Sequence, residues 1–138
     1  MKALQEASVM PVVGQHVFVY GTLRKGQGAN YILKGRSEFV SDCVIHANIY
    51  DLGSFPGVKL DDTQNLVYGE VYRITDDTLL ALLDRYEGYP NLYDRKLVET
   101  SLGLSAWTYE FNHSVSDSLL VPGGDWVAYR VESDRAAG

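Results

Sequence analysis

The chain has 138 residues, a length that suits one domain with a hydrophobic core of its own. Hydrophobic residues make up 46% of it, which excludes a disordered or collagen-like chain, and no apolar run approaches the ~20 residues that span a bilayer. The net charge of −6 and the lack of a basic cluster argue against a nucleic-acid partner. Because Cys43 is the one cysteine, no internal disulfide can form, and we expect a reducing, cytoplasmic location without membrane association.

The first strand and the loop after it form the first candidate site. Residues 1–15 are expected to be a flexible N-terminal extension. The strand follows over residues 17–20, where β-branched and aromatic side chains run directly into Gly21. Residues 21–30 are polar and rich in glycine, which predicts a loop whose backbone N–H groups are free to meet a ligand. The loop is therefore a candidate site for a carboxylate or an oxyanion, and an ordinary strand exit is the alternative.

The middle of the chain has the pattern of strands and short turns. One or two helical turns are expected over residues 30–35, ended by Gly35. Ser41 and Asp42 interrupt the strand-like segment that follows, which indicates a bend or bulge, and residues 53–57 are expected to be a turn. The expected strands are residues 38–52, 58–60, 66–74, 94–99 and 105–111.

The clearest helix lies between two of these strands. Thr75 or Asp76 can cap its start, and Gly88 and Pro90 end it. Its apolar stripe, at positions i, i+3, i+4 and i+7, consists of Leu79, Leu82, Leu83 and Tyr86. Near the C-terminus a turn leads into a short helix or strand, and residues 132–138 are expected to be a flexible tail. Strands that do not alternate with helices predict an α+β fold with a mixed, mostly antiparallel sheet, in a single domain over residues 16–131.

Glu87 is the main candidate for catalysis. It lies where the helix ends, next to the negative end of the helix dipole and the last unpaired carbonyl groups. This placement disfavours the ionised carboxylate, so it should raise the pKa of Glu87 toward the range useful for an acid and base at neutral pH. A solvated glutamate at a helix end is the alternative.

The remaining polar residues carry weaker signals. Glu70 lies between Tyr68 and Tyr72 on one strand face, where it can orient a pocket residue or pair with Arg73 or Arg95 of a neighbouring strand. The three histidines, His16, His46 and His113, have no spacing suited to a metal, so no metal site is expected. Cys43 lies among apolar residues and is expected to be a small buried hydrophobic side chain.

The segment Tyr20-Gly21-Thr22-Leu23-Arg24 resembles the signature of the gamma-glutamylcyclotransferase-like family, whose first strand ends in Tyr-Gly-Thr or Tyr-Gly-Ser followed by Leu. Further family-like segments follow in the expected order at residues 67–72, 83–95 and 124–126. The resemblance spans about residues 16–130. It implies a small mixed β-barrel, mostly antiparallel and flanked by one main helix and short helical turns.

The resemblance also implies a reaction. In a γ-glutamyl amine or γ-glutamyl amino acid, the free α-amine attacks the γ-carbonyl, closes 5-oxoproline and releases the attached amine, with no cofactor. Glu87 matches the position of the family's catalytic glutamate and would act as general acid and base. The residues that would bind this small-molecule substrate are Tyr20, Gly21, Thr22, Leu23, Arg24 and Tyr93.

Two other classes of protein remain open at this point. The chain can be a non-catalytic binder of small ligands that keeps the same fold and pocket, because a fold does not determine a function. It can also be an interaction domain with a tyrosine-rich surface. The sequence specifies neither the group attached to the γ-glutamyl unit nor the oligomeric state.

Overall fold

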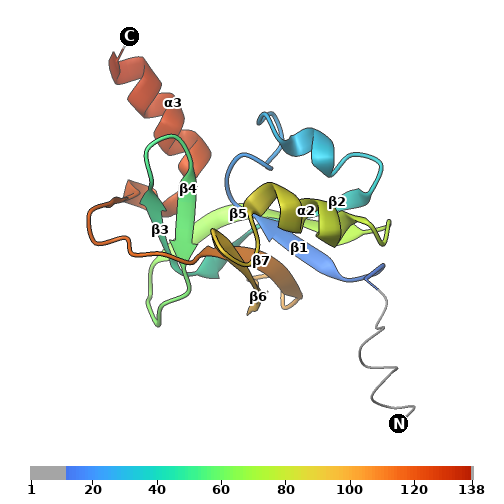
Figure 1. The fold of residues 1–138 in the computed structure, drawn as a ribbon. Helices are drawn as coiled ribbons and strands as arrows, with labels where there is room; N and C mark the ends of the chain where they lie inside the picture. Colours follow the sequence, from blue (N-terminus) through green and yellow to red (C-terminus); the bar gives the residue numbers. More distant parts are fainter. Residues whose placement is uncertain (1–11, 138) are drawn as a thin grey trace.

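The fold is built around the strand β1 (His16–Val19), which lies near the middle of a curled sheet in the computed structural model (Figure 1). The structure describes residues 12–137, and these contain eight strands in the order β2-β5-β1-β7-β4-β3-β8, with β6 paired to β7. The other strands are β2 (Ser37–His46), β3 (Asn48–Asp51), β4 (Pro56–Lys59), β5 (Leu66–Ile74), β6 (Tyr93–Glu99), β7 (Ser105–Phe111) and β8 (Leu119–Leu120).

The sheet is mixed and mostly antiparallel, as the sequence predicts. Strand β7 runs parallel to both β1 and β4, and the other neighbouring strands of the described chain are antiparallel. The expected bulge is present in β2, where the register with β5 shifts between Phe39 and Ser41. The sheet curls into a half-barrel, and the predicted α+β class is confirmed.

Both faces of β1 are buried, which explains its continuous apolar sequence. Val17 and Val19 face one core, which includes Leu79 and Leu83 of the helix α2 (Leu79–Glu87). Phe18 alternates with them and faces the second core. The second core holds Phe18, Tyr20, Cys43, Ile45, Ala47, Ile49, Val58, Val67, Val71, Ala106, Val121 and Trp126. Cys43 is buried as expected, and burial raises the pKa of its thiol to about 11, so the thiol stays protonated at neutral pH.

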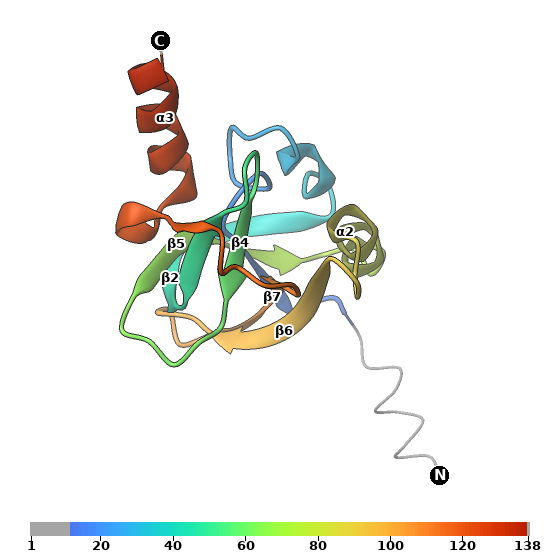
Figure 2. The same ribbon diagram turned by 60° about the vertical axis from the view of Figure 1, so that its left-hand side comes forward.

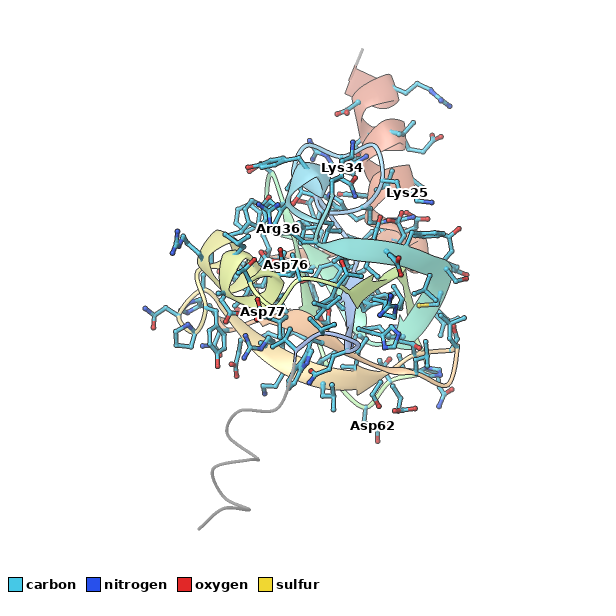
Figure 3. All side chains as sticks on the ribbon, turned by 90° about the vertical axis from the view of Figure 1, so that its right-hand side faces the viewer. Lys25, Lys34, Arg36, Asp62, Asp76 and Asp77 are labelled. Carbon is cyan, nitrogen blue, oxygen red and sulfur yellow. The ribbon has the colours of Figure 1, made fainter. Side chains whose placement is uncertain are left out.

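Helix α2 ends as the sequence predicts, at Gly88 in the left-handed conformation with φ of +67°. The prediction of its apolar stripe is only partly confirmed, because Tyr86 is 44% exposed and does not join the core. The helix packs near the short turn η1 (Asn30–Ile32). Figure 3 shows Arg36 beside Asp76 here, and the backbone N–H of Asp76 donates to the Arg36 carbonyl (3.2 Å).

The C-terminal segment differs from the expectation. After the turn η2 (Pro122–Gly124), the chain forms the helix α3 (Trp126–Ala137), which is longer than the short helix or strand that the sequence predicts. It continues through residues 132–137, where a flexible tail is expected, and it extends away from the sheet (Figures 1 and 2). The side chain of Trp126 at its start is buried in the second core, and this contact anchors the helix.

The structure divides the strand expected over residues 38–52 into β2 and β3, and it adds the short strand β8, which the sequence does not predict. Pro56 and Gly57 are expected in a turn, but they belong to β4 because β4 pairs with β3 through them. Residues 1–11 of the predicted N-terminal extension lie outside the described residues. Within residues 12–137, no helix has the length and apolar character needed to cross a membrane.

Candidate active site

A cavity of about 260 Å³ opens where β1 ends. Four segments line it: β1 with the loop that follows, the turn before β4 with the first residue of β4, the C-terminal end of α2 with the chain that follows, and β7. Its lining is mainly apolar and aromatic, and Glu87 is its one carboxylate among the described residues. The lining residues are Phe18, Val19, Tyr20, Gly21, Thr22, Leu23, Phe55, Pro56, Tyr86, Glu87, Leu92, Tyr93 and Tyr109.

Glu87, the last residue of α2, points its titratable group into this apolar surrounding. Burial raises the pKa of Glu87 from its ordinary value of 4.5 to about 7, because the low-polarity cavity disfavours the charged form. The direction agrees with the sequence argument, and the cause is desolvation, which the sequence argument did not include. A carboxyl group with this pKa can take up and release a proton at neutral pH.

Asp84 holds the helix end in place. Its carboxylate accepts a hydrogen bond from the hydroxyl of Tyr109 in β7 (2.6 Å) and pairs with the guanidinium of Arg95 in β6. Asp84 lies one helical turn before Glu87, so both contacts fix the position of Glu87 relative to the sheet. Arg95 therefore pairs with Asp84 and not with Glu70, which answers one of the alternatives that the sequence left open.

The backbone carbonyl and N–H groups at the start of the loop after β1, beside the cavity, differ in their hydrogen bonding. The carbonyl groups of its first three residues, 21–23, all accept a hydrogen bond, and within residues 12–137 the N–H groups of the same residues have no hydrogen-bond acceptor. Gly21 O accepts from Arg24 N (3.1 Å), Thr22 O from Ala29 N (2.9 Å), and Leu23 O from Asn30 Nδ2 (2.8 Å). Unpaired N–H groups beside a cavity can bind an anion, as the sequence predicts for this loop.

Pro56 links the loop to the opposite wall. A Cβ atom at Gly21 would lie 2.6 Å from Pro56 Cγ, so glycine is needed because the loop packs against this ring. The carbonyl of Pro56 accepts a hydrogen bond from the buried hydroxyl of Tyr93 (2.6 Å). Burial, and then the charge of Glu87, raise the pKa of Tyr93, so its hydroxyl stays protonated and its oxygen can still accept a hydrogen bond.

Tyr20 and Thr22 are also held by hydroxyl contacts. The buried Tyr20 hydroxyl donates to the carbonyl of Tyr109 (2.6 Å), and burial raises its pKa well above the usual value. The Thr22 hydroxyl shares a hydrogen bond of 2.8 Å with the hydroxyl of Tyr86. This second contact joins the loop directly to the residue that precedes Glu87.

Arg24 is the one predicted substrate-binding residue that does not line the cavity. Its guanidinium pairs with Glu70 (3.3 Å) and with Asp125 (2.9 Å), so it is directed into the protein beside the loop. A role of Arg24 in substrate binding stays a prediction, and its guanidinium lies outside the cavity lining. The partner of Glu70 is accordingly Arg24, whereas Arg73 pairs with Glu38.

The structure brings the other predicted site residues together: Tyr20, Gly21, Thr22, Leu23, Glu87 and Tyr93 all line the cavity. Sequence reasoning missed several lining residues, among them Phe55, Pro56 and Leu92. Phe55 and Pro56 sit in the Gly-Ser-Phe-Pro-Gly segment, which signalled a turn and gave no sign that the turn faces residues 20–23. Tyr86 and Leu92 could have been found as sequence neighbours of Glu87 and Tyr93.

The comparison with known protein families agrees with this geometry. The family model described as "Gamma-glutamyl cyclotransferase, AIG2-like" matches residues 17–128, which contain the loop, Glu87 and Tyr93. The chain belongs to this family. The match to the family model extends from the second residue of β1 into the first turn of α3.

Individual members of the gamma-glutamyl cyclotransferase, AIG2-like family are similar over most of the chain. The gamma-glutamylcyclotransferase family protein YtfP of Escherichia coli K12 is 35% identical over 111 residues, covering 80% of this chain and 95% of YtfP. The solution structure of Escherichia coli ytfP aligns with a TM-score of 0.65 and 36% identity, covering 82% of this chain and 96% of the other.

A second relative has a name that specifies its substrate. The "Gamma-L-glutamyl-butirosin B gamma-glutamyl cyclotransferase" of Niallia circulans is 32% identical over 128 residues, covering 85% of this chain and 78% of the relative. Together these similarities support a function of the gamma-glutamylcyclotransferase type and a small-molecule substrate.

Proposed function

We propose that this protein is a γ-glutamyl cyclotransferase that converts a γ-glutamyl amine or γ-glutamyl amino acid into 5-oxoproline and the free amine. One observation carries the proposal: a carboxyl group with a pKa of about 7 shares a cavity with residues 21–23, whose backbone N–H groups have no acceptor within residues 12–137. The first can move protons at neutral pH, and the second can bind a carboxylate or an oxyanion. Family membership supports the same activity.

The substrate would lie between the loop and the helix end. Its α-carboxylate, or the oxyanion that develops on the γ-carbonyl, would accept hydrogen bonds from the N–H groups of residues 21–23. Its α-amine would face Glu87 and the oxygen of Tyr93, which has an accepting lone pair because its hydrogen is donated to Pro56. The cavity would thereby hold the amine and the γ-carbonyl of one molecule close together, and this proximity lowers the barrier to ring closure.

The proton balance requires one group that can act in both directions. The α-ammonium group first gives a proton to Glu87, and the free amine then attacks the γ-carbonyl carbon, forming the ring C–N bond. The bond from the same carbon to the leaving nitrogen breaks as Glu87 returns a proton to that nitrogen. The second proton that the ring nitrogen loses also ends on the released amine, so the reaction consumes no water and needs no cofactor.

The name of one relative indicates the kind of amine that leaves when the ring closes. The name of the Niallia circulans relative describes a γ-glutamyl group attached to butirosin B. Its similarity to this chain supports a substrate in which a γ-glutamyl unit is attached to a larger amine. The exposed side chains of Phe55 and Leu92 on the cavity lining would contact that amine.

The direct test is release of 5-oxoproline, measured by mass spectrometry, from a panel of γ-glutamyl dipeptides, γ-glutamyl-ε-lysine and simple γ-glutamyl amines. The wild type should release 5-oxoproline from at least one compound. Glu87→Gln, which keeps the shape of the side chain but cannot accept the proton, should lose about 10²- to 10⁴-fold in rate. Glu38→Gln is the matched control, because Glu38 is an exposed glutamate of β2 outside the cavity.

Each result discriminates between the alternatives. Turnover by the wild type and Glu38→Gln, with little by Glu87→Gln, supports both the reaction and the acid–base role. Comparable rates in Glu87→Gln would overturn the role of Glu87. No release from any compound, together with tight binding of 5-oxoproline, would favour the non-catalytic binding protein.

A further inference from the structure

We propose that Glu70 is a positioning residue of the active site, which holds the loop after β1 in the shape that binds the substrate. This inference rests on the proposed function, because it assigns the loop to substrate binding. Glu70 lies on β5, does not line the cavity and has no part in the proton transfer described above.

The contacts of Glu70 converge on two consecutive residues of the loop. Its Oε2 accepts a hydrogen bond from Arg24 Nε (3.3 Å), and its Oε1 accepts one from the backbone N–H of Lys25 (3.0 Å). The side chain of Glu70 is 6% exposed. Lys25 also contacts the neighbouring strand, with its Nζ 3.2 Å from the ring centroid of Phe39, and Figure 3 shows it above β2. One buried carboxylate thus binds the loop by a side chain and by the backbone.

A second route runs from Glu70 through Tyr72 to the part of the loop that lines the cavity. The Tyr72 hydroxyl donates to Glu70 Oε1 (2.9 Å) and accepts from Asn30 Nδ2 (3.3 Å). The same Asn30 amide donates to the carbonyl of Leu23 (2.8 Å). Through this chain Glu70 fixes the carbonyl group of Leu23, a residue that lines the cavity. This carbonyl shares its planar peptide unit with the N–H of Arg24, which donates to Gly21 O (3.1 Å), so the same contact also holds the turn that begins at Gly21.

The far side of the loop is held by the beginning of α3. Arg24 Nη1 pairs with Asp125 (2.9 Å), whose carboxylate also accepts the N–H of Ala128 in the first turn of the helix. A Cβ atom at Gly21 would lie 3.8 Å from Trp126, so the loop also packs closely beside this helix. Arg24 therefore connects the loop to β5 on one side and to α3 on the other.

This arrangement is better explained by positioning than by stability. Removing a carboxylate and its partner from water is costly, and well-packed apolar residues often give equal or greater stability at such a position. A fixed loop has a direct use, because a displacement of about 1 Å in groups that hold a substrate can cost about 10²-fold in rate. The network provides that fixation, with every contact directed at the loop or at residues that hold it.

The test is Glu70→Gln, which keeps the size of the side chain and removes its charge. We expect KM for the best γ-glutamyl compound to rise about tenfold, as for the loss of one charge-assisted hydrogen bond, with a smaller change in kcat. Binding of 5-oxoproline should weaken by a similar factor. The pH at which kcat falls on the acid side should not move, because Glu87 is intact.

A structural readout separates this inference from the proposed function. Hydrogen exchange of the Lys25 amide should be faster in Glu70→Gln, since its acceptor is weakened, and unchanged in Glu38→Gln, the matched surface ion-pair variant. Asp125→Asn serves as the second variant, because it loses the charge next to Arg24 but keeps an oxygen for the helix cap. It should also raise KM.

The outcomes are distinct. The proposal would be overturned if the Lys25 amide exchanged at the wild-type rate in Glu70→Gln and KM were unchanged in both Glu70→Gln and Asp125→Asn. It would also be overturned if Glu70→Gln shifted the pH at which kcat falls on the acid side, because Glu70 would then take part in the proton transfer. If the wild type neither turns over the panel nor binds 5-oxoproline, the proposed function fails. The exchange rates then still decide whether Glu70 holds the loop.

Discussion

Burial of Glu87 should make the folding stability depend on pH in a direction opposite to that of an ion-paired surface glutamate. The pKa of Glu87 is about 7 in the folded protein, whereas its ordinary value is 4.5. Between these two values the folded protein keeps the proton and the unfolded chain releases it. Because the unfolded state then binds fewer protons, the free energy of unfolding falls as the pH rises.

The size of the effect follows from the shift. A difference from 4.5 to about 7 corresponds to about 3 kcal/mol, since each unit is worth 1.36 kcal/mol. The contribution is present in full below pH 4.5, declines through the window and is lost above pH 7. Glu87 is partly exposed, so the measured change is expected at or somewhat below this value.

Glu87→Gln isolates this contribution, because glutamine has no charge to bury. Urea unfolding of the wild type and the variant at pH values from 4.5 to 8.5 gives the two free energies of unfolding. From the lowest to the highest pH, the free energy of unfolding of the variant should rise relative to that of the wild type by about 3 kcal/mol. Titration of the histidines does not affect this difference, because both proteins contain them. A stability gain of this kind at a catalytic position is a common consequence of removing a strained functional group.

Glu38→Gln is again the control, since Glu38 is exposed and its ion pair with Arg73 is worth little. The difference between this variant and the wild type should stay small at every pH. If the difference in the free energy of unfolding between Glu87→Gln and the wild type also did not change with pH, the reasoning would be refuted. Glu87 would then have the same pKa in the folded and unfolded chains.

Two further substitutions test the framework of the site. Gly21→Ala places a Cβ atom 2.6 Å from Pro56, so it should raise KM and lower the free energy of unfolding by about 1–3 kcal/mol. Steady-state kinetics and urea unfolding measure the two effects. No change in either would show that the loop accommodates the methyl group. Asp84→Asn removes the charge that anchors α2 to β6, so it should lower the free energy of unfolding by about 1.5–3 kcal/mol. It should also lower kcat, because Glu87 is displaced. A normal kcat would contradict the anchoring role.

Local sequence patterns were sufficient for most of the fold. The strand over β5 is predicted with its observed bounds, and the helix end at Gly88 follows from the need for a left-handed residue there. Helix α3 was predicted too short, because its sequence has little apolar periodicity and its anchor, the burial of Trp126, is a tertiary contact. Tyr86 fits the helical period of the core but lies at the cavity, which the period alone cannot reveal.

The sequence by itself determined most of the strands and helix α2 and, through the family resemblance, indicated that residues 20–23, Glu87 and Tyr93 are the residues to examine. These conclusions depend on neighbours along the chain, which a sequence contains. Tertiary structure alone decided that burial raises the pKa of Glu87, that Arg24 turns away to Glu70 and Asp125, and that Pro56 closes the cavity. Each of these depends on side chains that are distant in sequence and meet only when the sheet curls.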